Sequence, residues 1–223
     1  MTALSLLQLS SPTLPVGAFT YSEGLEALIH SSVLETERDV QCWLEAELLR
    51  GCVRIEAASL DLFVQDFRRW IFSSDLSCMH HLLELDSFLM ATREAAEVRA
   101  QQRQMGAALI HLLEQMGYPL PEALDLAWPA AWAWASLSLS VPPQEMVEGY
   151  LYSWVANQIS SAVRLVPLGP TRAQVLQHNL MHQIYEQAAQ LLKADPLELW
   201  NAGVGLSMAQ LSHVELYSRL FRS

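Results

Sequence analysis

Apolar residues recur at three- and four-residue steps along most of the chain, and this spacing constrains its fold more than any other feature. In the stretch 39–69 the apolar side chains that share one helical face are Val40, Trp43, Leu44, Leu48, Leu60, Phe63, Val64 and Phe67. Gly51 interrupts the stretch, which is therefore either one bent helix or two helices. The pattern predicts a helical core.

Other long helices are expected at 85–116, 144–164 and 172–193, and shorter ones at 22–31, 122–137 and 196–211. The alternating segment 136–141 resembles a strand, but one strand has no partner for its backbone groups, so we expect a helix end and a loop. No linker or repeat divides the chain. We predict a single all-α domain over residues 1–223, a bundle of about eight to ten helices.

Hydrophobic residues make up 52% of the chain and charged residues 17%. Such low charge indicates either a large surface covered by a partner or a second copy, or a richly packed lone core. The net charge is −11 and Lys193 is the only lysine, which argues against binding to nucleic acid or to anionic membranes.

Targeting and redox signals point to a cytoplasmic protein. The longest apolar run contains Pro129 and several serines and is too short to span a membrane, and no basic residue precedes Arg38 as a signal peptide would require. Cys42, Cys52 and Cys78 form no C-x-x-C pair, so we expect buried thiols in a reducing compartment.

Compact catalytic signatures are missing. The chain has no G-K-[ST], G-x-S-x-G, H-E-x-x-H or G-x-G-x-x-G, so we predict that it is not an enzyme. Two alternatives stay open: a helical enzyme using acid/base pairs such as Glu94 and His111, and a scaffold that binds a small molecule near Trp128, Trp132 and Trp134.

A metal centre is not expected, and neither is a tightly bound cofactor. His178 and His182 stand four residues apart on a predicted helix and can share a cation, but two ligands are fewer than a zinc or nickel centre needs. His80 and His81 are adjacent, about 100° apart on a helix, and chelate poorly.

Two charged segments are candidate contact sites. Arg93 and Glu97 are spaced as a surface helix pair, and Arg99 lies nearby, which indicates either a solvated face or a contact patch for a partner. The segment 212–223 is predicted to be an interaction tail, because aromatic, leucine and arginine side chains dominate interface energies. Its candidate contact residues are Tyr217, Arg219, Leu220, Phe221 and Arg222. The alternative is a tail that docks on its own core.

Four segments resemble a known family in their order along the chain. "LPVGAFTYSEGLE" (14–26), "TREAAEVRAQQRQMG" (92–106), "AVRLVPLGPTRAQ" (162–174) and "YSRLFRS" (217–223) are similar to motifs of the urease accessory protein F (UreF) family. Pro170 stands where the family often has Gln, and Val214 follows His213 where the family usually has Glu. Side-chain roles at these two positions are therefore not transferred.

The resemblance implies an all-α maturation chaperone that forms a homodimer. Such a protein bridges a D/H-type accessory protein and a nickel-carrying G-type GTPase, and the assembly inserts nickel into apo-urease. Modulation of the GTPase, and passage of nickel through an internal tunnel, are further family expectations. The resemblance also implies a tail that is free or mobile until a partner orders it. The partner-binding residues that it implies are Glu23, Gly24, Glu26, Arg93, Glu94, Arg99, Tyr217, Arg219, Leu220, Phe221 and Arg222.

Overall fold

The computed structural model describes residues 2–73 and 76–223, and within these ranges it contains helices and no strand. The α-helices are α1 (Thr2–Leu9), α2 (Leu25–His30), α3 (Glu37–Arg50), α4 (Val53–Ser73), α5 (Leu76–Ala91), α6 (Ala96–Gln115), α7 (Trp128–Ser138), α8 (Pro143–Leu165), α9 (Pro170–Leu191) and α10 (Val204–Ser212). Short 3₁₀ helices are η1 (Ala18–Thr20), η2 (Pro196–Glu198) and η3 (His213–Glu215). The predicted all-α single-domain bundle is confirmed.

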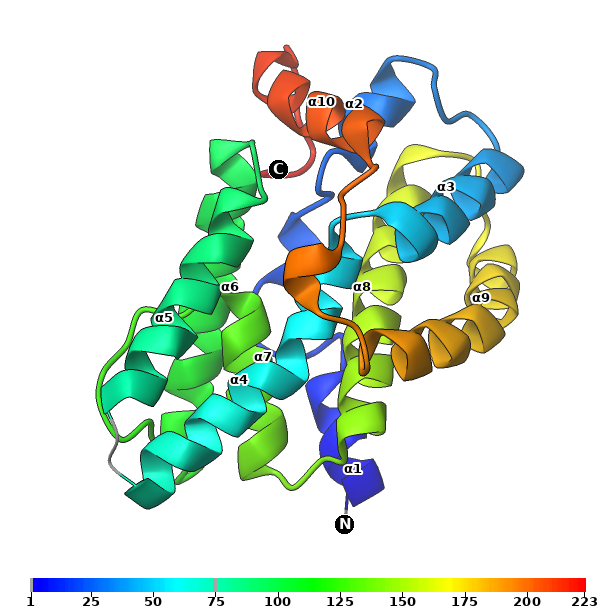
Figure 1. Ribbon diagram of the computed structural model, residues 1–223. Coiled ribbons are helices and arrows are strands. Elements are labelled where there is room, and N and C mark those ends of the chain that lie inside the picture. The colour runs from blue at the N-terminus through cyan, green and yellow to red at the C-terminus, as the bar shows by residue number, and fades with distance from the viewer. Residues whose placement is uncertain (1, 74–75) are drawn as a thin grey trace.

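Helices α4 and α8 run through the middle of the bundle (Figure 1). Helices α5, α6 and α7 lie on one flank, and α3 and α9 lie on the other. The large side chains Phe63 and Phe67 of α4 and Trp132 of α7 are fully buried in the core. At one end of the bundle α2 and α10 lie side by side, and the C-terminal residues end beside them.

Several predicted boundaries are confirmed. The stretch around Gly51 is two helices, α3 and α4, and the predicted helices at 144–164 and 172–193 are α8 and α9. Helix α7 ends at Ser138, so the segment 136–141 is a helix end and a loop.

The single helix predicted over 85–116 is wrong. Helix α5 ends at Ala91 and α6 begins at Ala96, because the Thr92 side chain bonds back to the Leu89 carbonyl at 2.7 Å and Arg93 turns into the core. The short predicted helices also differ: α7 begins at Trp128, the stretch 196–211 is divided between η2 and α10, and α1 has no counterpart among the predictions. Apolar spacing does not reveal a break made by a buried arginine.

Cys52 and Cys78 are buried as expected, but Cys42 is exposed, which corrects the prediction for that thiol. Among the described helices, none combines the length and the apolar character that crossing a bilayer requires.

Candidate partner-binding site

The segment that precedes α2 has a tightly constrained backbone. Gly24 has a φ of 91°, in the left-handed region, and Glu23 before it has a φ of 53°, which is uncommon for a residue with a side chain. A Cβ on Gly24 would lie 2.9 Å from Cγ of Gln210, so only glycine lets α10 pack against this turn. The turn therefore fixes α10 relative to the two carboxylates that flank it.

Glu23 connects three helices from inside the molecule. Its carboxylate accepts hydrogen bonds from the Gln101 amide at 2.7 Å and from the Trp154 indole at 3.1 Å. Its carbonyl accepts a hydrogen bond from the Gln210 amide at 3.1 Å. These contacts join α6, α8 and α10 around the turn.

His213 at the end of α10 lies between two carboxylates and is fully buried. Its Nε2 is 3.0 Å from Oε2 of Glu26, and its Nδ1 is 3.0 Å from Oε2 of Glu97. Partial burial acts to raise the pKa of Glu97, but hydrogen bonds from His213 and Arg219 outweigh it and lower that pKa below its ordinary value. The cluster joins α2, α6 and α10.

The last residues of the chain bind to the same carboxylates. Glu26 accepts hydrogen bonds from the backbone N–H of Leu220 at 2.6 Å and of Phe221 at 3.1 Å. Arg219 donates to Oε1 of Glu97 at 2.6 Å, and the Ser223 carbonyl accepts a hydrogen bond from the Ser22 backbone N–H at 2.9 Å. We call residues 217–223 the C-terminal strap.

The expectation of a free tail is therefore corrected. The strap docks on its own chain, the alternative that the sequence left open, because the buried Glu26 carboxylate accepts from its backbone and Glu97 accepts from the Arg219 side chain. Phe221 is buried, and the Arg164 guanidinium stacks over its ring, 4.4 Å from the ring centroid. Tyr217 and Leu220 point outward, with Tyr217 fully exposed.

An exposed apolar surface extends along α10 into the strap. Val204, Met208 and Leu211 of α10 are exposed, and their spacing of four and then three residues places them on one face of the helix. We define the C-terminal apolar surface by the exposed side chains of Val204, Met208, Leu211, Val214, Tyr217 and Leu220. Exposed apolar surface of this kind typically marks a protein–protein contact.

Arg93 lies inside the bundle, and its predicted place at or near a partner surface is corrected. It is 3% exposed and donates to Oε1 of Glu56 from Nη2 at 2.6 Å and from Nε at 3.0 Å. Tyr150 donates to the other Glu56 oxygen at 2.9 Å. Burial raises the pKa of the Glu56 carboxyl, and the Arg93 guanidinium opposes that rise. The predicted pairing of Arg93 with Glu97 is wrong, since Arg93 precedes α6.

Arg99 and Glu94 lie at the break between α5 and α6. Arg99 is half-buried and donates to the carbonyls of Arg93 and Glu94 at 2.5 and 2.7 Å, while Glu94 is exposed. Arg99 thus stabilises the turn that points Arg93 inward.

The predicted contact residues divide into two groups. Those that reach the surface, wholly or in part, are Glu94, Arg99, Tyr217, Arg219, Leu220 and Arg222. Those buried inside the chain are Glu23, Gly24, Glu26, Arg93 and Phe221. Within the buried group, Glu23 and Gly24 contact α10, Glu26 contacts the strap, and Phe221 belongs to the strap. Arg93 instead pairs with Glu56 inside the bundle.

Sequence reasoning missed the partners of these buried groups, chiefly Glu56, Gln101 and Tyr150. Glu56 and Gln101 carry a usable signal, because each is a polar residue on the apolar side of a predicted helix.

Glu47 is a buried carboxyl beside the linker that leads into α10. Its side chain folds back over Gly51, and Gly203 approaches so closely that an added Cβ would lie 3.1 Å from Oε2 of Glu47. Burial raises the pKa of Glu47 to about 7, with Arg93 acting in the opposite direction.

His178 and His182 both lie on the exposed side of α9, and His182 contacts Glu186 at 3.1 Å. In the part of the chain that the structure describes, no group of three or more His, Cys, Asp or Glu side chains is arranged to hold a metal ion.

The structure does not bring together the acid/base pair of the enzyme alternative, whereas the tryptophan alternative keeps one candidate site, because Trp128 lines the groove described below. His111 lies 15 residues along α6 from Ala96, about 22 Å at the helical rise, and Glu94 precedes the start of that helix. Trp132 and Trp134 are buried, and their indole N–H groups donate to the carbonyls of Met146 and Tyr118.

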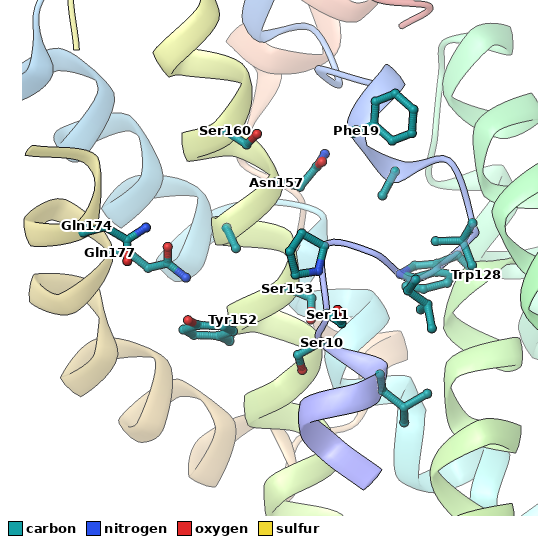
Figure 2. Close-up of a pocket in the computed structure, with 16 residues that line it drawn as sticks. Ser10, Ser11, Phe19, Trp128, Tyr152, Ser153, Asn157, Ser160, Gln174 and Gln177 are labelled. Atoms are coloured by element: carbon teal, nitrogen blue, oxygen red, sulfur yellow. The ribbon is translucent and has the colours of Figure 1, made fainter. Parts of the chain in front are cut away.

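A groove of about 340 Å³ lies on the outer side of α8 (Figure 2). Tyr152, Ser153 and Ser160 of α8 line it, Gln174 and Gln177 border it from α9, and the segment after α1 closes the other side. None of its 16 lining residues carries a charge.

Known proteins of one family match this chain over most of its length. The UreF family model matches residues 34–181. The chain is 37% identical over 218 residues to a urease accessory protein UreF of Prochlorococcus marinus subsp. pastoris, covering 96% of each chain. It is 38% identical to those of Microcystis aeruginosa and Thermosynechococcus vestitus, covering 99% of this chain and 97% of each relative. The chain therefore belongs to the UreF family of urease accessory proteins.

Proposed function

We propose that this protein is a cytoplasmic, non-enzymatic urease maturation chaperone. It bridges a D/H-type accessory protein and a nickel-carrying G-type GTPase, so that nickel reaches apo-urease as cargo in transit. The observation that carries the proposal is the likeness to proteins named urease accessory protein UreF over nearly the full chain.

Energy coupling in such an assembly depends on differential affinity. A chaperone without a phosphate-binding lysine loop relies on its partner for GTP hydrolysis. It modulates the GTPase only by binding one nucleotide state of that partner more tightly than the other. A net charge of −11 suits the transit of a dication.

The C-terminal apolar surface is our candidate for the accessory-protein contact. Replacing both Tyr217 and Leu220 by Ala removes exposed apolar area but keeps the backbone hydrogen bonds of the strap. We expect the double variant to copurify at least tenfold less of one accessory protein, and the urease made with it to contain little nickel.

The host for this experiment carries the urease subunits and accessory genes of one genome, with this gene supplied as wild type, as variant or not at all. The matched control replaces Val175 and Tyr185, two exposed apolar residues of α9, by Ala. Fully metallated urease in the absence of the gene would refute the proposed function. Normal copurification by the Tyr217/Leu220 variant would refute only the assigned surface.

We further propose that the groove beside α8 is the contact between two copies of this chain. Two acidic chains repel one another unless the contact patch is uncharged, and this groove is uncharged. The small side chains of Ser153, Ala156 and Ser160 on α8 allow a close approach of the two-fold related helix.

Ser160→Arg places a charge in that contact. Across the two-fold axis, the new arginine of one copy lies opposite the new arginine of the other. We expect the dimer dissociation constant to rise at least tenfold in sedimentation velocity experiments, with an unchanged circular dichroism spectrum. Asn179→Arg, at an exposed position of α9 outside the groove, is the control. An equally strong dimer with Ser160→Arg would exclude this contact.

A further inference from the structure

The protonation of His213 is constrained by its surroundings. Both ring nitrogens lie 3.0 Å from carboxylate oxygens, one of Glu26 on α2 and one of Glu97 on α6. A neutral imidazole carries one N–H and donates to only one of them, whereas the imidazolium donates to both. Two ionised carboxylates at these distances therefore require a charged His213.

The two carboxylates are the anchors of the C-terminal strap. Glu26 accepts from the strap backbone at Leu220 and Phe221, and Glu97 accepts from the Arg219 side chain. Glu26, Glu97, His213 and Arg219 together carry two negative and two positive charges when His213 is protonated. Loss of the His213 proton leaves one excess negative charge and an acceptor nitrogen facing a carboxylate oxygen, in a site shielded from water.

We propose that His213 is a positioning residue that latches the C-terminal strap in a proton-dependent manner. The strap is docked while His213 is charged and Glu26 and Glu97 are ionised. It is released towards alkaline pH, when His213 loses its proton, and towards acidic pH, when the carboxylates gain theirs. Glu215, on the same turn as His213, is exposed and takes no part. The inference stands on these contacts and does not depend on the proposed function.

Carbon-detected NMR of the full-length protein from pH 4 to pH 10 tests the latch. The carbonyl-carbon shifts of residues 220–223 report docking without interference from amide exchange, and the His213 ring nitrogen shifts report its proton. We expect the ratio of docked to released strap to fall at least tenfold towards high pH. The pH midpoint of this fall should equal the midpoint at which His213 loses its proton. A strap that stays docked after His213 loses its proton would overturn the proposal.

Three variants separate the latch from a purely structural role. His213→Gln has no proton to lose in this pH range. Glu97→Gln lets a neutral His213 imidazole donate to Glu26 and accept a hydrogen bond from the new amide. Both variants should therefore lose the release of the strap at alkaline pH. Arg219→Gln removes an anchor but keeps both carboxylates, so its alkaline release should remain. Alkaline release that persists in folded Glu97→Gln protein, or that vanishes in Arg219→Gln, would contradict the proposal. If His213→Gln fails to fold, the other two variants decide.

Discussion

Arg93→Met is expected to lower the free energy of unfolding by about 3–5 kcal/mol, since it leaves the Glu56 carboxylate buried without its counter-ion. The Glu56 side chain is 1% exposed, so water cannot replace the lost guanidinium. Among the described residues, Tyr150 is the donor that remains for that carboxylate. Urea denaturation followed by circular dichroism measures the change.

Adding Glu56→Gln to Arg93→Met should restore most of the lost stability, because the amide needs no counter-ion and its oxygen still accepts from Tyr150. Arg38→Met, at an exposed position of α3, is the control and should change the stability by less than about 0.5 kcal/mol. Wild-type stability of Arg93→Met would mean that Arg93 faces solvent.

Glu47→Gln is expected to stabilise the protein at pH 8 by about 3 kcal/mol. The pKa of Glu47 rises from 4.5 to about 7 on folding, and each pKa unit corresponds to about 1.4 kcal/mol. Between pH 4.5 and about pH 7 the folded state binds more protons than the unfolded state, so the stability due to this group falls as the pH rises through that window. Above it, folding carries the full cost of a buried charge.

The gain from Glu47→Gln should therefore vanish near pH 4, where Glu47 is neutral in both states. Thermal unfolding of wild type and variant at pH 4, 6 and 8 gives the dependence. Glu35→Gln, at an exposed position, is the control and should change the melting temperature at none of these pH values. A loss of stability at pH 8 would show that the carboxylate makes a favourable contact when ionised.

The sequence was most informative where one helix face is apolar. Val40, Leu44 and Leu48 are fully buried on α3 as their spacing predicts, and Gly51 separates α3 from α4. The spacing could not reveal the break before α6, because it depends on Arg93 meeting Glu56, 37 residues earlier in the chain. Such a pairing is a property of the packed bundle and leaves no local pattern.

The candidate site was predictable as a set of segments but not as a geometry. The segments at 14–26, 92–106 and 217–223 do meet, yet Glu26, Arg93 and Phe221 face inward, whereas Tyr217 and Leu220 face outward. An aromatic or charged side chain suits an interface and a buried contact equally well. Only the three-dimensional packing tells which residues are exposed.

The strap also bears on when the surface forms during folding. Ser22 bonds through both its backbone N–H and its hydroxyl to the carbonyl of Ser223, 201 residues away. A contact of such sequence separation closes late, after the local helices have formed. The outward-facing Tyr217 and Leu220 therefore reach their bundle-bound arrangement only after the rest of the bundle has folded. Recruitment of a partner through this surface would thereby be restricted to molecules whose bundle is completely folded.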